Sequence, residues 1–242
     1  EICSPQRKSV FRPESVWNSL TISGANVTLD GSNNVGTNDI QNLFALSVTA
    51  VGTLTLSGDI DMAAANGDIV FASDDITINP ARQIASTGTI TFQTATPGID
   101  MGIGDTNEGI YQLTAAGAFG QPDELGALQA GFASIIIIGQ SNLAGTSGDI
   151  TLGASTLNGP LIIEGPDNAN RGIEIRDTLT ATGNGSITID THAGALILNT
   201  TSAFTLVTND QNITLSGNIT VGSSSTLTTG AGGGGNITFS GA

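Results

Sequence analysis

Hydrophobic and polar residues alternate in short runs along most of this chain. The runs share a five-residue phrase: glycine, a small polar residue, an apolar residue, threonine or valine, and a second apolar residue. A two-residue period is typical of a strand with one buried face, so each copy predicts one short β-strand. Close copies begin at Gly67, Gly88, Gly148, Gly185, Gly217 and Gly235, and looser copies begin at Ala25, Gly52, Asp74 and Gln211.

Each strand is preceded by glycine together with aspartate, asparagine or serine. We expect the glycine to supply a positive φ and the polar side chain to bond backbone amides, because both are needed where a chain turns a corner. The repeated aspartates at Asp59, Asp68 and Asp149 are therefore predicted to bond corner amides.

The copies recur at intervals of 21 to 26 residues, as from Gly67 to Gly88 and from Gly185 to Gln211, with further copies between them. Periods of about 20 to 50 residues are typical of solenoids, and the interleaving indicates more than one strand in each turn. We therefore predict an all-β parallel β-helix, or β-solenoid, of about ten coils. An antiparallel β-sandwich also combines short alternating strands with frequent turns, and it is the alternative.

Two regions lack the phrase. Residues 1–20 are polar, basic and proline-bearing, which predicts an N-terminal arm or cap on the first coil, with an unstructured tail as the alternative. The solenoid is expected to occupy residues 21–242. Within it, residues 94–131 are predicted to form a loop excursion with one short helix.

That helix is expected to be capped by Asp123. It would carry Leu125, Leu128 and Phe132, which are apolar at helical spacing. The solenoid is then expected to resume with a buried strand over Ile135–Ile138.

Composition narrows the function classes. The 21 acidic and 6 basic residues give a net charge of −15 at pH 7, which would repel a phosphate backbone and argues against nucleic-acid binding. Cys3 is the only cysteine, so no disulfide can form within the chain. The longest apolar run, Ile135–Ile138, is far too short to cross a membrane. Because the chain begins with Glu1 and stops soon after a copy of the phrase, we expect a segment of a longer or processed protein.

The stretch from Asp123 to Gly165 resembles a segment of the filamentous-haemagglutinin-like and related β-strand-repeat surface adhesins of bacteria. The resemblance rests on the Leu125/Leu128 turn, the isoleucine strand, the GDITL strand and the NGPLII strand, and covers about a fifth of the chain. It implies a right-handed β-helix, a location outside the cell, and a role in adhesion, matrix or filament formation.

Candidate catalytic groups are few. His192 is the only histidine and is interpreted as a corner residue, because a hydrolase needs a placed nucleophile and an orienting acid around it. One acidic cluster offers acid and base candidates for a polysaccharide lyase or hydrolase, the alternative function. No aromatic residue accompanies it, so a solvated corner is the favoured interpretation. The cluster consists of Glu164, Asp167, Glu174 and Asp177 around Arg171 and Arg176.

The candidate metal-binding loops and glycosylation triplets are also interpreted as structural features. The loop from Asp30 lacks the glycine and the final acid of an EF-hand, and the GDTNEG loop from Gly104 is interpreted as a hydrated turn rather than a weak cation site. Six asparagines begin Asn-x-Ser/Thr triplets and are expected to cap corners rather than to carry glycans. They are Asn26, Asn184, Asn199, Asn212, Asn218 and Asn236.

The leading hypothesis is a structural or adhesive module of an extracellular bacterial protein that is not an enzyme. No catalytic, cofactor-binding or metal-binding residue is assigned. Expected partners are further copies stacked end to end, and surface glycans or receptors, with neither nucleic acid nor membrane insertion.

Overall fold

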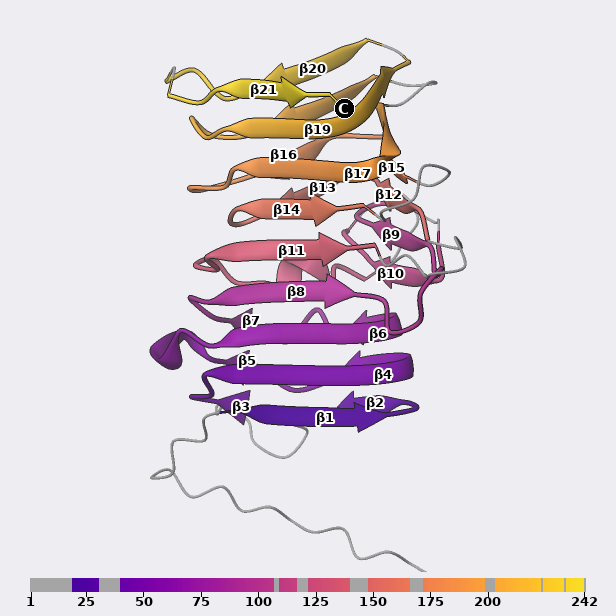
Figure 1. The fold of residues 1–242 in the computed structure, drawn as a ribbon. Helices are drawn as coiled ribbons and strands as arrows, with labels where there is room; N and C mark the ends of the chain where they lie inside the picture. The colour runs from indigo at the N-terminus through magenta and orange to yellow at the C-terminus, as the bar shows by residue number, and fades with distance from the viewer. Residues whose placement is uncertain are drawn as a thin grey trace, which may run out of the picture.

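The computed structural model describes residues 19–30, 40–106, 109–116, 122–139, 148–165, 172–198, 203–222, 224–232 and 234–241. Its strands stack along one axis, from the indigo N-terminal end to the yellow C-terminal end in Figure 1. All ladders between named strands in these ranges are parallel. The predicted all-β solenoid is therefore confirmed, and the antiparallel sandwich is wrong.

The front face is the longest stack of strands. Its strands all run in the same direction in Figure 1 while the chain rises, which makes the coil right-handed. In spatial order it contains β1 (Leu20–Gly24), the first half of β4 (Ala45–Leu56), the first half of β6 (Asp68–Ile78), β8 (Thr89–Gln93), β11 (Ser134–Ile138), β14 (Leu161–Glu164), the first half of β17 (Ile187–Leu198), the first half of β19 (Ile213–Val221) and β21 (Ile237–Ser240).

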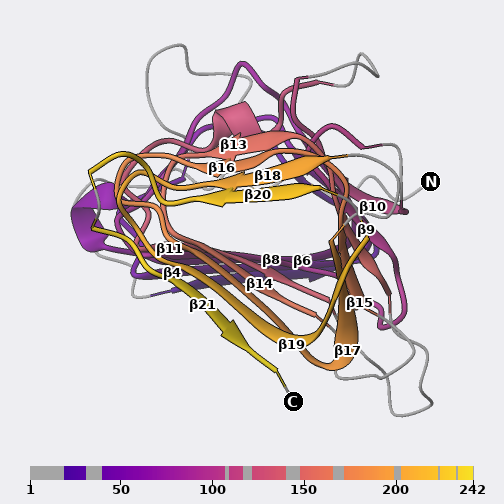
Figure 2. The same cartoon turned by 90° about the horizontal axis from the view of Figure 1, so that it is seen from above.

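The side face follows the front face after a sharp corner, because β4, β6, β17 and β19 bend and continue into it. Figure 2 shows the two faces meeting at an angle when the molecule is seen from above. The side face contains β2 (Val27–Leu29), the second halves of β4 and β6, β10 (Tyr111–Leu113), β9 (Met101–Ile103), β12 (Ile150–Leu152), β15 (Gly172–Ile175) and the second halves of β17 and β19.

The back face closes each turn with short strands in two sheets. A 3-10 turn, η2 (Leu125–Ala127), lies between them, and Leu128 after it forms a bridge to Ile84. A second 3-10 turn, η1 (Ala63–Ala65), leads from the back face to the front face. The strands are β3 (Ile40–Gln41), β5 (Ile60–Asp61) and β7 (Ile84–Ala85) in one sheet, and β13 (Ser155–Leu157), β16 (Leu179–Ala181), β18 (Phe204–Val207) and β20 (Ser225–Thr228) in the other.

The core consists of columns of apolar side chains, because alternate residues of every strand point inward and the strands are in register. Buried residues of all three faces form one continuous cluster. The two front-face columns hold Leu20, Leu46, Ile69, Ile90, Ile135, Leu161, Ile187, Ile213 and Ile237 in one, and Ile22, Val48, Phe71, Phe92, Ile137, Ile163, Ile189, Leu215 and Phe239 in the other.

The phrase marks the start of a strand after a corner on two different faces. Copies at Gly67 and Gly88 begin front-face strands, whereas copies at Gly52 and Gly148 begin side-face strands. This double use explains the interleaving in the sequence. The solenoid makes about eight turns rather than ten, because a single turn between Ile90 and Ile135 takes up the whole excursion.

The excursion at 94–131 is more ordered than the sequence predicts. It contains the expected short helix as the single 3-10 turn η2, and Leu125, Leu128 and Phe132 are all buried in the core. It also inserts two strands, β9 and β10, into the side face. The short helical and loop insertion expected around 94–131 is confirmed, but its two strands were not predicted, because segments of three residues are too short to show alternation in the sequence. Strand β9 pairs with β12, and β10 pairs with β9 and lies beside β6.

The phrase glycines have a different role from the one expected. Among them only Gly217 has a positive φ. A Cβ atom at Gly67 would overlap the carbonyl oxygen of Leu43, and a Cβ atom at Gly148 would overlap that of Ile99, one rung below each glycine. Glycine is therefore required at these corners because the backbones approach closely, and not because of the dihedral angle.

Candidate interaction surface

Aspartate side chains connect successive turns at the corners. The Oδ1 atom of Asp68 accepts a hydrogen bond from the amide of Thr89 at 2.8 Å, and Asp59 accepts one from Gln83 at 2.9 Å. The Oδ1 atom of Asp149 accepts one from Gly172, also at 2.9 Å. The prediction that these aspartates bond corner amides is therefore confirmed, and each bond joins two adjacent turns.

Asparagine does the same in other copies of the phrase. The Oδ1 atom of Asn26 accepts from the amide of Thr53, and that of Asn212 accepts from the amide of Asn236, both at 2.9 Å. Donor and acceptor are equivalent second residues of copies one turn apart. The expected capping role is thus confirmed for Asn26 and Asn212. Asn184 and Asn218 are exposed, and Asn199 lies outside the described residues.

One row of outward side chains along the middle of the front face is uncharged, and it lies beside the row that contains Glu164 and Asp190. We call this set the front hydroxyl row, since six of its nine members are threonine or serine. Its members are exposed or half-buried, and they repeat at the strand spacing of about 4.8 Å. In spatial order they are Thr21, Ser47, Val70, Thr91, Ile136, Ile162, Thr188, Thr214 and Thr238.

A buried carboxylate lies inside the excursion. Glu124 is 3% exposed; its Oε1 accepts from the amide of Ile78 at 2.9 Å, and its Oε2 accepts from the amide and hydroxyl of Thr114, both at 3.0 Å. Burial raises the pKa of Glu124, these hydrogen bonds oppose the shift, and the nearby charge of Asp75 adds to it. Glu124 therefore joins the ends of β6 and β10, where the regular ladder is interrupted.

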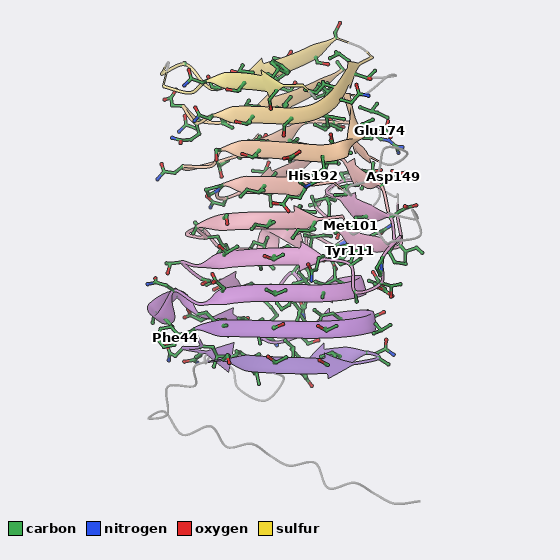
Figure 3. The ribbon with its side chains drawn as sticks, viewed as in Figure 1. Phe44, Met101, Tyr111, Asp149, Glu174 and His192 are labelled. Atoms are coloured by element: carbon green, nitrogen blue, oxygen red, sulfur yellow. The ribbon has the colours of Figure 1, made fainter. Side chains whose placement is uncertain are left out.

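Asp75 and Tyr111 lie near the same interruption. Burial raises the pKa of Asp75, and hydrogen bonds from the backbone of Ile76 and Gln112 and from Thr53 partly offset this. Tyr111 is fully buried, its hydroxyl has no hydrogen-bond partner among the described residues, and burial raises its pKa. Figure 3 shows Tyr111 one level below Met101 at the inserted strands.

The raised pKa of Glu124 predicts a pH dependence of stability. A carboxyl group whose pKa is higher in the folded than in the unfolded state stabilises the fold below its unfolded pKa, and that contribution is lost as the pH rises through the folded pKa. We expect the wild type to lose stability relative to Glu124→Gln as the pH rises from about 4 towards neutrality. Urea unfolding of both proteins across this range measures the difference, and a difference that is independent of pH would contradict the assignment.

His192 lies at the corner between the two halves of β17, as predicted. Its φ is +50°, its side chain is exposed, and its amide donates to Oδ1 of Asp190 at 2.8 Å. The ring nitrogen Nδ1 lies 3.9 Å from the same oxygen. This arrangement is a turn stabilised by an aspartate.

The predicted acidic cluster is divided between two faces in the described part of the chain. Glu164 ends β14 on the front face, whereas Glu174 is on β15 of the side face and pairs with Arg176 at 2.8 Å. Asp177 accepts from the amide of Thr178 at 2.6 Å. Asp167 and Arg171 lie outside the described residues. Figure 3 shows Glu174 and Asp149 on the side of the solenoid opposite Phe44.

The described residues contain no group of three histidine, cysteine, aspartate or glutamate side chains placed to hold a metal ion. The loop after Asp30, part of the GDTNEG loop, and Cys3 lie outside the described residues, as do residues 1–18 of the predicted N-terminal arm.

In comparisons with known proteins, no family model, no curated protein and no solved structure matches this chain. Within the ranges that the structure covers, no helix has the length and apolar character needed to cross a membrane.

Proposed function

We propose that this chain is a structural and adhesive β-solenoid of an extracellular bacterial protein, without enzymatic activity. The front hydroxyl row is the observation that carries this proposal. It is an uncharged strip along the whole described length of a protein whose net charge is −15. Its threonine hydroxyls can donate and accept hydrogen bonds, and its central Val70, Ile136 and Ile162 offer apolar contact.

A surface of this composition suits uncharged polysaccharides, which present hydroxyl groups and C–H faces together. Its rigidity comes from the in-register ladder beneath it, so few side chains lose conformational freedom on contact. The corner acids support the structural and non-enzymatic part of the proposal. The carboxylate oxygens of Asp59, Asp68 and Asp149 accept hydrogen bonds that join successive turns. The resemblance of the stretch from Asp123 to Gly165 to bacterial surface adhesins supports the extracellular location.

Adhesion of protein-coated beads to a neutral polysaccharide film tests this function. Thr91→Glu combined with Thr188→Glu places two charges in the front hydroxyl row, and we expect retention of the beads under flow to fall at least about tenfold, since each charge must be desolvated on contact. The matched control places the same two charges on the back face, with Thr156→Glu and Thr180→Glu. Equal retention of both variants would contradict the proposal.

An assay of the wild-type protein with soluble glycans tests the enzymatic alternative. We expect no product from neutral or acidic glycans, with or without calcium. Product release that is lost in Glu174→Gln or Asp177→Asn, with folding unchanged, would overturn the non-enzymatic assignment and identify a glycan-cleaving site at the end of β15.

A further inference from the structure

Three Asn-Gly pairs lie at corners that lead from the back face to the front face. In such a pair the backbone nitrogen of glycine can attack the side-chain amide of asparagine, because glycine has no side chain to block the approach. Each pair is therefore a candidate site of self-modification. The pairs are Asn66 with Gly67 before β6, Asn158 with Gly159 before β14, and Asn184 with Gly185 before β17.

The hydrogen bonds of the glycine amides distinguish the three pairs. Exposure does not, since in each pair the asparagine is exposed and the glycine is buried. The amide of Gly67 donates to the carbonyl of Met62 at 3.2 Å, and the amide of Gly185 donates to the carbonyl of Thr182 at 3.1 Å. The amide of Gly159 has no acceptor among the described residues. Its nitrogen can therefore attack without first losing a hydrogen bond.

The corner at Gly159 also has more room than the other two corners. A Cβ atom at Gly159 would meet no atom closer than 3.4 Å, whereas a Cβ atom at Gly67 or Gly185 would overlap a backbone carbonyl oxygen. Close packing of this kind fixes the backbone of Gly67 and Gly185. The backbone at Gly159 is free to make the small rotation that brings its nitrogen to the side chain of Asn158.

A threonine of the next turn donates to the side chain of Asn158. The hydroxyl of Thr182 lies 3.2 Å from Oδ1 of Asn158 and 3.2 Å from the carbonyl oxygen of Leu157. A donor at Oδ1 stabilises the negative charge that this oxygen gains when the carbonyl carbon Cγ is attacked. Asn66 accepts a similar bond from Thr87, but the amide of its glycine is engaged. Among the three pairs, only the second combines a donor at Oδ1 with a free glycine amide.

We infer that Asn158 is a site of spontaneous deamidation. The nitrogen of Gly159 loses its proton to solvent and attacks Cγ of Asn158. The N–Cγ bond forms and the Cγ–Nδ2 bond breaks, and Nδ2 takes a proton and leaves as ammonia. Water then opens the cyclic succinimide, which gives aspartate when it breaks the new N–Cγ bond and isoaspartate when it breaks the original main-chain bond. The net reaction consumes water and releases ammonia, and it does not depend on the proposed adhesive role.

The reaction changes the corner between β13 and β14. Both products carry a carboxylate, so each event adds one negative charge to the net charge of −15. Isoaspartate also adds a methylene group to the main chain, two residues before Pro160, whose carbonyl accepts from the amide of Ile135 at 2.7 Å. The lengthened backbone weakens this contact between turns, and we expect proteases to cut the isoaspartate form more easily at this corner.

A pair of variants tests the contribution of Thr182. Thr182→Val replaces the hydroxyl with a methyl group and should slow deamidation of Asn158 at least about fivefold, because Oδ1 loses its donor. Thr182→Ser keeps the hydroxyl and should react at close to the wild-type rate. The rate at Asn66 reports whether each variant is folded, since it stays low only while Gly67 keeps its hydrogen bond. Equal rates at Asn158 in the two folded variants would contradict the contribution of Thr182.

Peptide mapping by mass spectrometry of the 242-residue protein, incubated at neutral pH, tests the inference itself. Urea-unfolded protein gives the baseline rates, because all three pairs are then free of tertiary contacts. Relative to these baselines, we expect Asn158 in the folded protein to deamidate at least about fivefold faster than Asn66 or Asn184, whose glycine amides must first break a hydrogen bond. A folded protein in which Asn66 or Asn184 reacts as fast as Asn158, or in which none of the three reacts, would overturn the inference.

Discussion

Replacing Phe71 with alanine is expected to lower the free energy of unfolding by about 3–5 kcal/mol, the usual cost of removing a buried aromatic ring. Phe71 is fully buried in the second front-face column, in register with Phe92, and the two ring centroids are 5.8 Å apart. The strand neighbours Val48 and Phe92 are held by their own ladders, so the cavity cannot collapse easily.

Denaturant unfolding followed by far-UV circular dichroism measures this loss. Val70→Ala is the matched control, because Val70 is adjacent in the same strand but points outward and is only half-buried. We expect this substitution to cost less than about 1 kcal/mol. If Val70→Ala is as destabilising as Phe71→Ala, the assignment of inward and outward residues in β6 is wrong.

Replacing Gly67 with alanine is expected to lower the free energy of unfolding by about 2–3 kcal/mol. At an unstrained position the same substitution normally stabilises a protein, because alanine lowers the conformational entropy of the unfolded chain. The reason is steric: the added methyl group would overlap the carbonyl oxygen of Leu43 and the side chain of Met62. A backbone oxygen cannot rotate away as a side chain can, so the corner must open. The φ of Gly67 is not positive, so dihedral strain does not contribute.

Gly241→Ala is the control for this prediction, since a Cβ atom there has no neighbour within 4 Å. We expect its melting temperature to match the wild type. A stable Gly67→Ala protein would show that glycine at this corner is not required by close approach, and it would remove the structural explanation for the first residue of the phrase.

Much of the fold could be predicted from the phrase. The alternation in GDIVF and GTITF correctly predicts strands in which Ile69, Phe71, Ile90 and Phe92 point into the core. The spacing of the copies correctly predicts stacked turns. The role of the aspartate could also be predicted, because a short acceptor beside a glycine at the start of a strand has few partners other than corner amides.

The front hydroxyl row could not be predicted from the sequence alone. The phrase contains the threonines of the front hydroxyl row, but only the register shows that Thr91, Ile136, Ile162 and Thr188 are consecutive members of one row.

By itself, the sequence determined the local structure: short strands with a two-residue period, corners formed by glycine and a polar side chain, and a repeat that stacks. The tertiary structure alone decided which copies lie on the front face and which on the side face. It also decided that residues 94–131 contribute two strands to the side face. Strands β9 and β10 are three residues long, so their stability comes from the neighbouring ladder and not from their own pattern. The burial of Glu124 also depends on the tertiary structure. Its hydrogen-bond partner Ile78 is 46 residues away in the sequence and becomes a neighbour only when the turns stack.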